Sequence, residues 1–136
     1  MTAAVPLTLT ADAHGATVTV TLANVSTAAV AVWFEVEGPN GPLYDCLSVD
    51  LTGPGDRRTL LLTGDRNAST SGRVVLDPDA ALSATIDLAD WALAPINGGD
   101  ALAPGAWTAT LWYRCDEPDC WRGEVVAAPV SVHVAD

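Results

Sequence analysis

The sequence contains no lysine. All six basic residues are arginine and stand against 17 acidic residues, which gives a formal net charge of −11 at pH 7. A surface with this charge repels phosphate backbones and anionic lipid headgroups, so it argues against nucleic acid or a membrane as a main partner. A simpler interpretation is that the acidity keeps a valine-rich domain in solution.

Long hydrophobic runs are also missing. No apolar stretch reaches the roughly 18 residues of a transmembrane helix. Residues 1–15 lack the basic and apolar regions of a secretion signal, so the chain as written is expected to be cytoplasmic unless it was trimmed from a secreted protein. The N-x-[ST] sites at Asn24 and Asn67 would matter only in a eukaryotic secreted protein. Abundant alanine without lysine is typical of a high-GC bacterial genome.

Cysteine is scarce, with Cys46, Cys115 and Cys120 as its three occurrences. Cys115 and Cys120 enclose four residues, and in a hairpin they would face each other closely enough for a disulfide. Such a bridge closes a small loop and stabilises only modestly. Two free thiols or a bound metal are the alternatives. Neither His14 nor His133 is near them in sequence, so no four-ligand zinc site is evident.

Candidate catalytic and metal-binding groups are few. Cys46 is interpreted as an inert thiol, because its pairing with His133 as nucleophile and base has no orienting motif behind it. Asp116, Glu117 and Asp119 offer carboxylates for Ca²⁺, but they lack the spacing and the glycine of an EF-hand loop, so a solvated acidic turn is the better interpretation. No catalytic residue, metal or cofactor is predicted.

Alternation of apolar and polar residues with period two dominates the chain and predicts half-buried strands. Turn signals such as GPNGP at 38–42 and GPG at 53–55 separate the runs. No segment has a clear helix period, although one helical turn is allowed within 90–99. The runs cover residues 5–10, 17–22, 30–37, 43–51, 58–62, 73–76, 82–88 and both arms of 102–134. The pattern predicts an immunoglobulin-like antiparallel β-sandwich of seven to nine strands, in a single domain over residues 1–136.

Trp33 and Trp112 differ in parity from the apolar residues of their strands. In the third run Val32 and Phe34 face the core, so Trp33 is expected to face outward. In the first arm of the last hairpin, the apolar set that includes Trp107 leaves Trp112 on the opposite side. Both tryptophans are therefore predicted on the outer face of a sheet.

The turn of the last hairpin decides the position of Trp121. Across a four-residue turn Trp121 would lie opposite Arg114, on the same side as Trp112, with Val126 and the alternating valines after it pointing inward. In a sandwich the strand of Trp33 joins the same sheet. The predicted binding surface is thus an outer aromatic face made by Trp33, Tyr44, Trp112 and Trp121. The alternatives are that a neighbouring segment covers these side chains or that the faces are exchanged.

Three segments carry a family resemblance: VTVTLANVS at 18–26, LDPDAALSATIDLADWAL at 76–93 and LAPGAWTATLWY at 102–113. They are similar to the immunoglobulin-like domain before the catalytic domain of deuterolysin-like and peptidyl-Lys metalloendopeptidases, and to the stand-alone intracellular proteinase inhibitors of bacilli. The resemblance spans residues 5–113. The chain departs from it at Trp107, where tyrosine is usual, and at CDEPDC, 115–120. The chain has no catalytic zinc motif, so the resemblance implies an accessory or inhibitory module rather than a peptidase.

The expected function is therefore non-enzymatic protein binding. The resemblance favours a peptidase as the protein partner, for which the chain would be an inhibitor or an accessory domain, and a homodimer is a further possibility. A carbohydrate-binding module that stacks sugars on a tryptophan stripe is the first alternative. An enzyme that uses Cys46 is the second.

Overall fold

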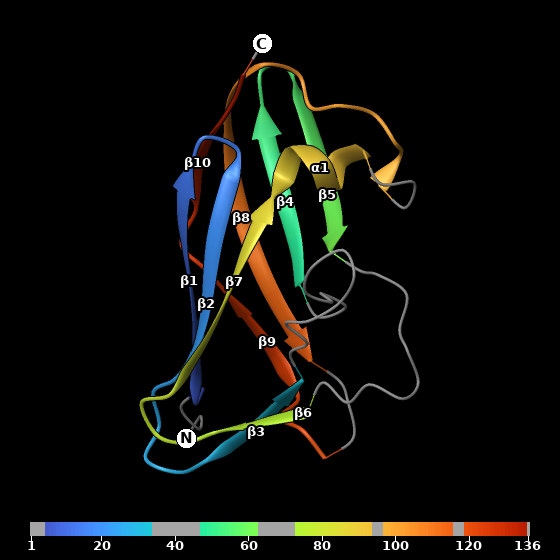
Figure 1. Cartoon of the computed structure of the whole chain (residues 1–136). Coiled ribbons are helices and arrows are strands. Elements are labelled where there is room, and N and C mark those ends of the chain that lie inside the picture. Colours follow the sequence, from blue (N-terminus) through green and yellow to red (C-terminus); the bar gives the residue numbers. More distant parts are fainter. Residues whose placement is uncertain (1–4, 34–46, 63–72, 94–96, 116–118, 136) are drawn as a thin grey trace.

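The computed structural model describes residues 5–33, 47–62, 73–93, 97–115 and 119–135, apart from the side chains of 61 and 62. These residues form antiparallel sheets of ten strands and one short α-helix (Figure 1). The all-β prediction is confirmed, with more strands than the seven to nine expected. In chain order the elements are β1 (Leu7–His14), β2 (Thr17–Asn24), β3 (Val30–Trp33), β4 (Leu47–Gly53), β5 (Asp56–Leu62), β6 (Arg73–Leu76), β7 (Ala81–Asp87), α1 (Leu88–Leu93), β8 (Gly105–Cys115), β9 (Gly123–Val126) and β10 (Val130–Val134).

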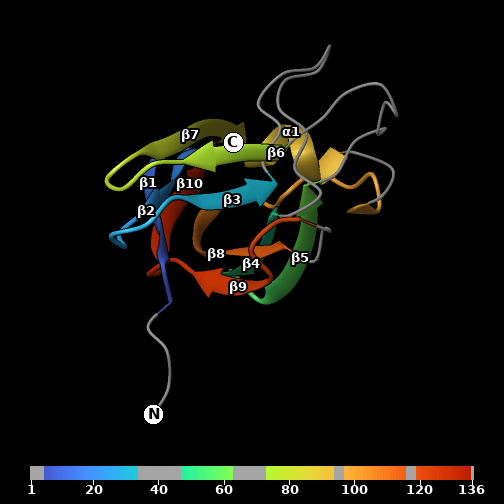
Figure 2. The same cartoon turned by 90° about the horizontal axis from the view of Figure 1, so that it is seen from below.

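The strands form two main sheets in a sandwich-like arrangement. The small sheet has the order β1-β2-β7, and the large sheet has the order β10-β8-β4-β5 with β9 also paired to β8. β3 and β6 pair only with each other among the described strands and cross one end of the molecule (Figures 1 and 2). Trp33 therefore lies outside the large sheet, contrary to the prediction that its strand joins it.

The core lies between the two sheets and follows from the alternation. In β2 the side chains of Val18, Val20 and Leu22 are fully buried, and the threonines between them are half-buried. The eleven residues of β8 bury every second side chain from Trp107 to Cys115. Burial of each such apolar side chain stabilises the fold by about 2 kcal/mol, so these two central strands define which faces meet.

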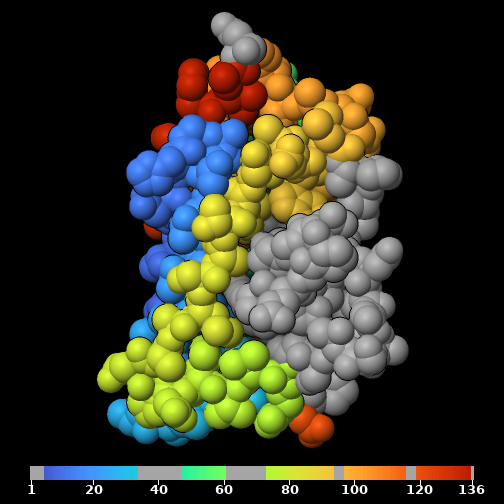
Figure 3. Space-filling model, viewed as in Figure 1, coloured from blue at the N-terminus to red at the C-terminus, as the bar shows by residue number. Residues whose placement is uncertain are grey.

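The outer face of the small sheet is lined with hydroxyl groups. β2 and β7 form one continuous surface in the view of Figure 3. Thr21 and Ser83 share a hydrogen bond of 2.9 Å across these strands. The outward positions of β1, β2 and β7 hold no phenylalanine, tyrosine or tryptophan. This face offers hydroxyls that already pair with each other rather than an apolar anchor for a partner.

Asn24 fixes the turn between β2 and β3. Its side chain is buried, and Nδ2 donates to the carbonyls of Ala28 and Leu76, each at 2.9 Å. Oδ1 accepts from the backbone N–H of Ser26 at 2.9 Å and from its hydroxyl at 2.7 Å. The N-x-[ST] pattern at this position is explained by the turn, because a buried and fully bonded amide cannot carry a glycan in the folded chain.

Candidate binding face

The connection between β8 and β9 is longer than a four-residue turn. Arg114 pairs with Glu124 and Cys115 pairs with Gly123, so the chain crosses between the strands over residues 116–122. Arg114 was expected to pair with Trp121, three positions earlier than its observed partner Glu124. A shift of register by an odd number of residues exchanges the two faces of a strand. The side chains from Trp121 to the end of β9 therefore point to the face opposite to the predicted one.

Trp121 accordingly lies on the core side. Its indole stacks on the ring of Tyr113, with centroids 6.3 Å apart and planes 17° apart. Tyr113 is fully buried on the opposite face of β8 from Trp112. A side chain at Gly123 would meet the Trp121 ring at 2.8 Å, so the indole is held between this glycine and the tyrosine. The prediction that Trp121 shares the face of Trp112 is wrong.

The same shift of register moves Val126 from the core side to the outer face. It was expected to point inward, but it is the cross-strand partner of Trp112 and is 47% exposed. The inward positions return in β10, where Val132 and Val134 are buried as predicted and Val130 is half-buried. Val126 thus joins Trp112 on the outer face.

Trp33 and Tyr44 complete the predicted aromatic set. Trp33 is half-buried and packs against the core, and its carbonyl accepts a hydrogen bond of 2.7 Å from the Tyr113 hydroxyl. This contact belongs to the end of the molecule crossed by β3 rather than to the outer face of the large sheet. Tyr44 lies outside the described residues. Of the four predicted side chains, Trp112 alone is shown on the outer face.

The cysteines are not arranged as a cross-strand pair. Cys115 faces the core, is buried, and is a free cysteine that lies opposite Gly123. The structure therefore has no disulfide between Cys115 and Cys120. With the longer connection, the residue opposite Cys115 is Gly123 and not Cys120. Cys120 is half-buried. Cys46 lies outside the described residues, and His133 is exposed on β10.

The acidic turn is described only at its end. Asp116 and Glu117 lie outside the described residues. Asp119 is exposed, and its backbone carbonyl accepts a hydrogen bond of 3.0 Å from Arg73 Nε. Within the described ranges, no group of three or more His, Cys, Asp or Glu side chains is placed to hold a metal ion. The same residues include no helix long and apolar enough to span a membrane.

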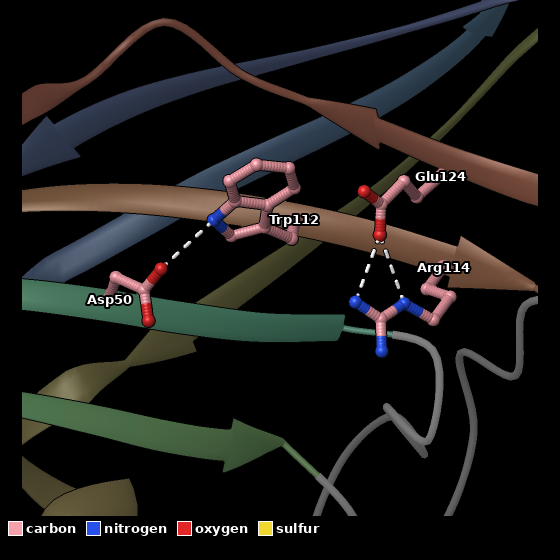
Figure 4. A network of polar contacts seen from close by, with 4 residues as sticks. All are labelled: Asp50, Trp112, Arg114 and Glu124. Carbon is pink, nitrogen blue, oxygen red and sulfur yellow. Dashed lines mark hydrogen bonds and ion pairs between the residues drawn. The ribbon is translucent and has the colours of Figure 1, made fainter.

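Trp112 lies in the outer face of the large sheet, between Ser48 of β4 and Val126 of β9. Its side chain is half-buried, and its indole Nε1 donates to Asp50 Oδ2 at 3.1 Å (Figure 4). Asp50 is exposed, and its Oδ1 accepts from the Thr59 hydroxyl at 3.0 Å. The three side chains come from β8, β4 and β5, so adjacent strands hold them in one row.

An ion pair borders this row. Arg114 donates to Glu124 Oε2 through Nε at 3.0 Å and through Nη2 at 2.9 Å. Both side chains are exposed on the same face as Trp112, as Figure 4 shows. Exposed pairs of this kind contribute little to stability, about 0 to 1 kcal/mol. Their effect here is local, because Glu124 compensates the positive charge beside the indole.

A shallow depression of about 340 Å³ opens on the other side of Asp50. Its lining includes Thr52, Arg57 and Thr59 as well as the Asp50 carboxylate. We call the surface formed by Trp112, Val126, Asp50 and this depression the Trp112 face. It combines an apolar centre with a carboxylate, hydroxyls and two arginines, and residue types of this kind are common at binding surfaces.

The sequence already contained a signal for Asp50. Leu47, Val49 and Leu51 are the inward set of β4, so Asp50 had to face outward in the same strand. The neighbourhood of Asp50, Trp112 and Val126 needed the pairing of β4 with β8 and of β8 with β9, which alternation within one strand does not give.

Comparisons with known proteins found no matching family model, no matching curated protein and no matching solved structure. The resemblance to the metalloendopeptidase-associated domains and to the proteinase inhibitors therefore stays a prediction from sequence.

Proposed function

We infer that the chain is a non-enzymatic protein-binding module and that the Trp112 face is its contact surface. The observation that supports this most strongly is a tryptophan near the middle of an open sheet face, with an exposed valine as its cross-strand neighbour. Full burial of a large apolar side chain is worth about 2 kcal/mol, and this indole realises only part of it within the monomer. Partly exposed aromatic residues with a polar surround are typical anchors of protein interfaces.

A protein partner fits this face better than a polysaccharide. Sugar-binding sheets stack successive sugar rings on several aligned aromatic side chains, as the predicted stripe required. On the outer positions of the large sheet, the described residues supply one aromatic side chain, because Trp33 and Trp121 pack against the core. A carbohydrate-binding module remains the second candidate, supported by the hydroxyls and the carboxylate beside the indole.

The nature of the protein partner is a finer proposal. The sequence resemblance supports a peptidase as the partner, with this chain as its inhibitor or accessory domain. The outer face of the large sheet supports a second copy of the chain as the partner. Peptidase inhibition assays and sedimentation equilibrium distinguish these versions. A concentration-dependent mass that is lost in Trp112→Ser would identify the homodimer.

The proposal is tested with a photo-crosslinking amino acid in place of Val126 in the producing cell. We expect crosslinks to a defined protein, and we expect them to disappear when Trp112→Ser is added. Because the indole lies on the outer face, that substitution should leave the melting temperature nearly unchanged. A crosslinker in place of Thr85, on the small sheet, is the matched control and should give no such product.

Two outcomes would contradict the proposal. If Trp112→Ser unfolds the domain, the indole is part of the stabilising core. If crosslinking at position 126 matches that at position 85, or survives Trp112→Ser, the face is not a specific contact. Binding to a glycan array that depends on Trp112, without a protein crosslink, would favour the carbohydrate module.

A further inference from the structure

We propose that the protein partner presents an arginine side chain to the Trp112 face, with its guanidinium stacked on the indole and hydrogen-bonded to Asp50. This inference rests on the proposed function and names the chemistry of the partner. It commits to a basic polypeptide segment rather than to an acidic segment or a sugar.

The Asp50 carboxylate is held in place before any partner arrives. Trp112 Nε1 donates to Oδ2 at 3.1 Å, and the Thr59 hydroxyl donates to Oδ1 at 3.0 Å. Each carboxylate oxygen can accept about two hydrogen bonds, so both retain acceptor capacity toward solvent. An acceptor that is already fixed loses little rotamer freedom on binding, which favours a directed contact.

The indole is suited to a cation for two reasons. Figure 4 shows the ring lying across the sheet, so that one of its faces is turned outward. The hydrogen bond from Nε1 to a carboxylate also polarises the ring and makes its π face more negative. A cation over a tryptophan face is attracted by the negative charge of the π system, and the attraction is stronger where water is displaced.

Arginine fits this arrangement better than lysine. A guanidinium is planar, so it can stack on the indole while its edge N–H groups reach a carboxylate beside the ring. Asp50 is placed at the edge of the indole, on the hydrogen-bonding side. A lysine ammonium is a compact charge, so a position over the ring does not also present N–H groups to the carboxylate at the ring edge.

The charge of the surroundings favours the same ligand. The formal net charge of −11 draws a basic segment toward the chain. The nearest cation on the β9 side, Arg114, is compensated by Glu124. Arg57 and Arg58 line the depression, and Arg122 lies beside the Arg114–Glu124 pair; these arginines favour an acidic ligand instead, and the glutamate peptide tests that case.

The test uses uniformly labelled full chain and four short acetylated, amidated peptides that share one glycine–serine host. Their central residue is arginine, citrulline, leucine or glutamate. NMR titration follows the Trp112 indole N–H, which is assigned from the spectrum of Trp112→Phe. We expect the arginine peptide to shift this signal with saturation, and citrulline, the neutral isostere, to bind at least about tenfold more weakly.

The control variants separate a directed contact from general attraction. Asp50→Asn removes the charge but keeps an amide oxygen that accepts from Trp112, while its amide N–H can donate to the Thr59 hydroxyl. This variant should bind the arginine peptide about tenfold more weakly. Asp12→Asn removes the same charge from an exposed strand position on the outer face of the small sheet and should change nothing. Equal weakening in both variants would show unspecific attraction and overturn the inference.

The remaining outcomes distinguish this inference from the proposed function. Equal affinity for arginine and citrulline, or a preference for leucine or glutamate, overturns the arginine site. If the crosslinked partner is still lost on Trp112→Ser, the protein-binding function stands without the arginine contact. If no crosslink depends on Trp112, the proposed function fails whatever the peptides do.

Discussion

At the scale of single residues, Gly53 leaves room for the indole of Trp107. The indole is buried, and its Nε1 donates to the carbonyl of Ala103 at 2.8 Å. A Cβ at position 53 would overlap the Trp107 ring. Gly53 is therefore needed for space, because it lacks the positive φ that other glycines of the chain have. The tyrosine that the family resemblance expected at position 107 would present a smaller ring to this glycine.

We expect Gly53→Ala to lower the free energy of unfolding by about 1 to 3 kcal/mol, the usual cost of overpacking a core. Urea denaturation followed by tryptophan fluorescence measures it. A double-mutant cycle with Trp107→Leu provides the control, because the smaller side chain makes room for the new methyl group. An equal cost of Gly53→Ala in both backgrounds would place its cause in the backbone rather than in the indole contact.

At the scale of elements, the sequence predicted strands better than it predicted their partners. The runs at 17–22 and 73–76 were correct because alternation is local, and the turn allowed within 90–99 corresponds to α1, which begins a little earlier, at Leu88. The pairing of β3 with β6 was not predicted, because the alternation within each strand does not show which distant strand, here about 40 residues away, is its partner. The orientation of Trp33 was predicted wrongly for the same reason.

The candidate site was half predicted for the same reason. Trp112 was placed correctly by the parity of β8, a strand long enough for its alternation to be unambiguous. Trp121 and Val126 were inverted because two cysteines with four residues between them look like the ends of a tight hairpin. In the structure Cys115 pairs with Gly123 and Trp121 stacks on Tyr113, a tertiary contact that the spacing of the cysteines does not reveal.

Arg58 makes several hydrogen bonds to the described residues between α1 and β8 and to the last turn of α1. Arg58 donates through Nη1 to the carbonyls of Asp100 at 2.8 Å and Ala101 at 3.4 Å. Through Nη2 it donates to Asn97 at 3.0 Å and Ala92 at 3.4 Å. The guanidinium carries five N–H donors on three nitrogens and reaches four carbonyls here, whereas an ammonium has three donors on a single atom. This arginine holds an irregular segment against β5.

We expect Arg58→Lys to speed hydrogen exchange of the backbone amides in 97–104 while the amides of β2 and β8 keep their protection. The reason is that the segment loses several charge-assisted hydrogen bonds, each worth about 1.5 to 3 kcal/mol, and can open locally. Mass-spectrometric hydrogen exchange measures the effect. Arg57→Lys, at an exposed neighbouring position of β5, is the control. Unchanged exchange in 97–104 would mean that packing alone holds the segment.

At the scale of the whole molecule, the dominant feature is charge. With a formal net charge of −11 on 136 residues, the carboxylates repel one another more strongly in the compact state than in the unfolded chain. The described ion pairs do not offset this, because the Arg114–Glu124 pair is exposed and contributes little. The same field steers a basic partner, so salt should slow association and stabilise the fold at the same time.

We therefore expect the melting temperature at pH 7 to rise when sodium chloride is raised from about 0.01 to about 0.5 M, since the screening length falls from about 30 Å to a few Å. A gain of about 1 kcal/mol corresponds to about 4 °C for a domain of this size. Differential scanning calorimetry measures it. The matched control is the same series near pH 4.2, the isoelectric point, where the net charge vanishes and the rise should disappear. A fall in melting temperature with salt at pH 7 would contradict this expectation. It would mean that the attraction between the arginines and the carboxylates stabilises the fold more than the repulsion among the carboxylates destabilises it.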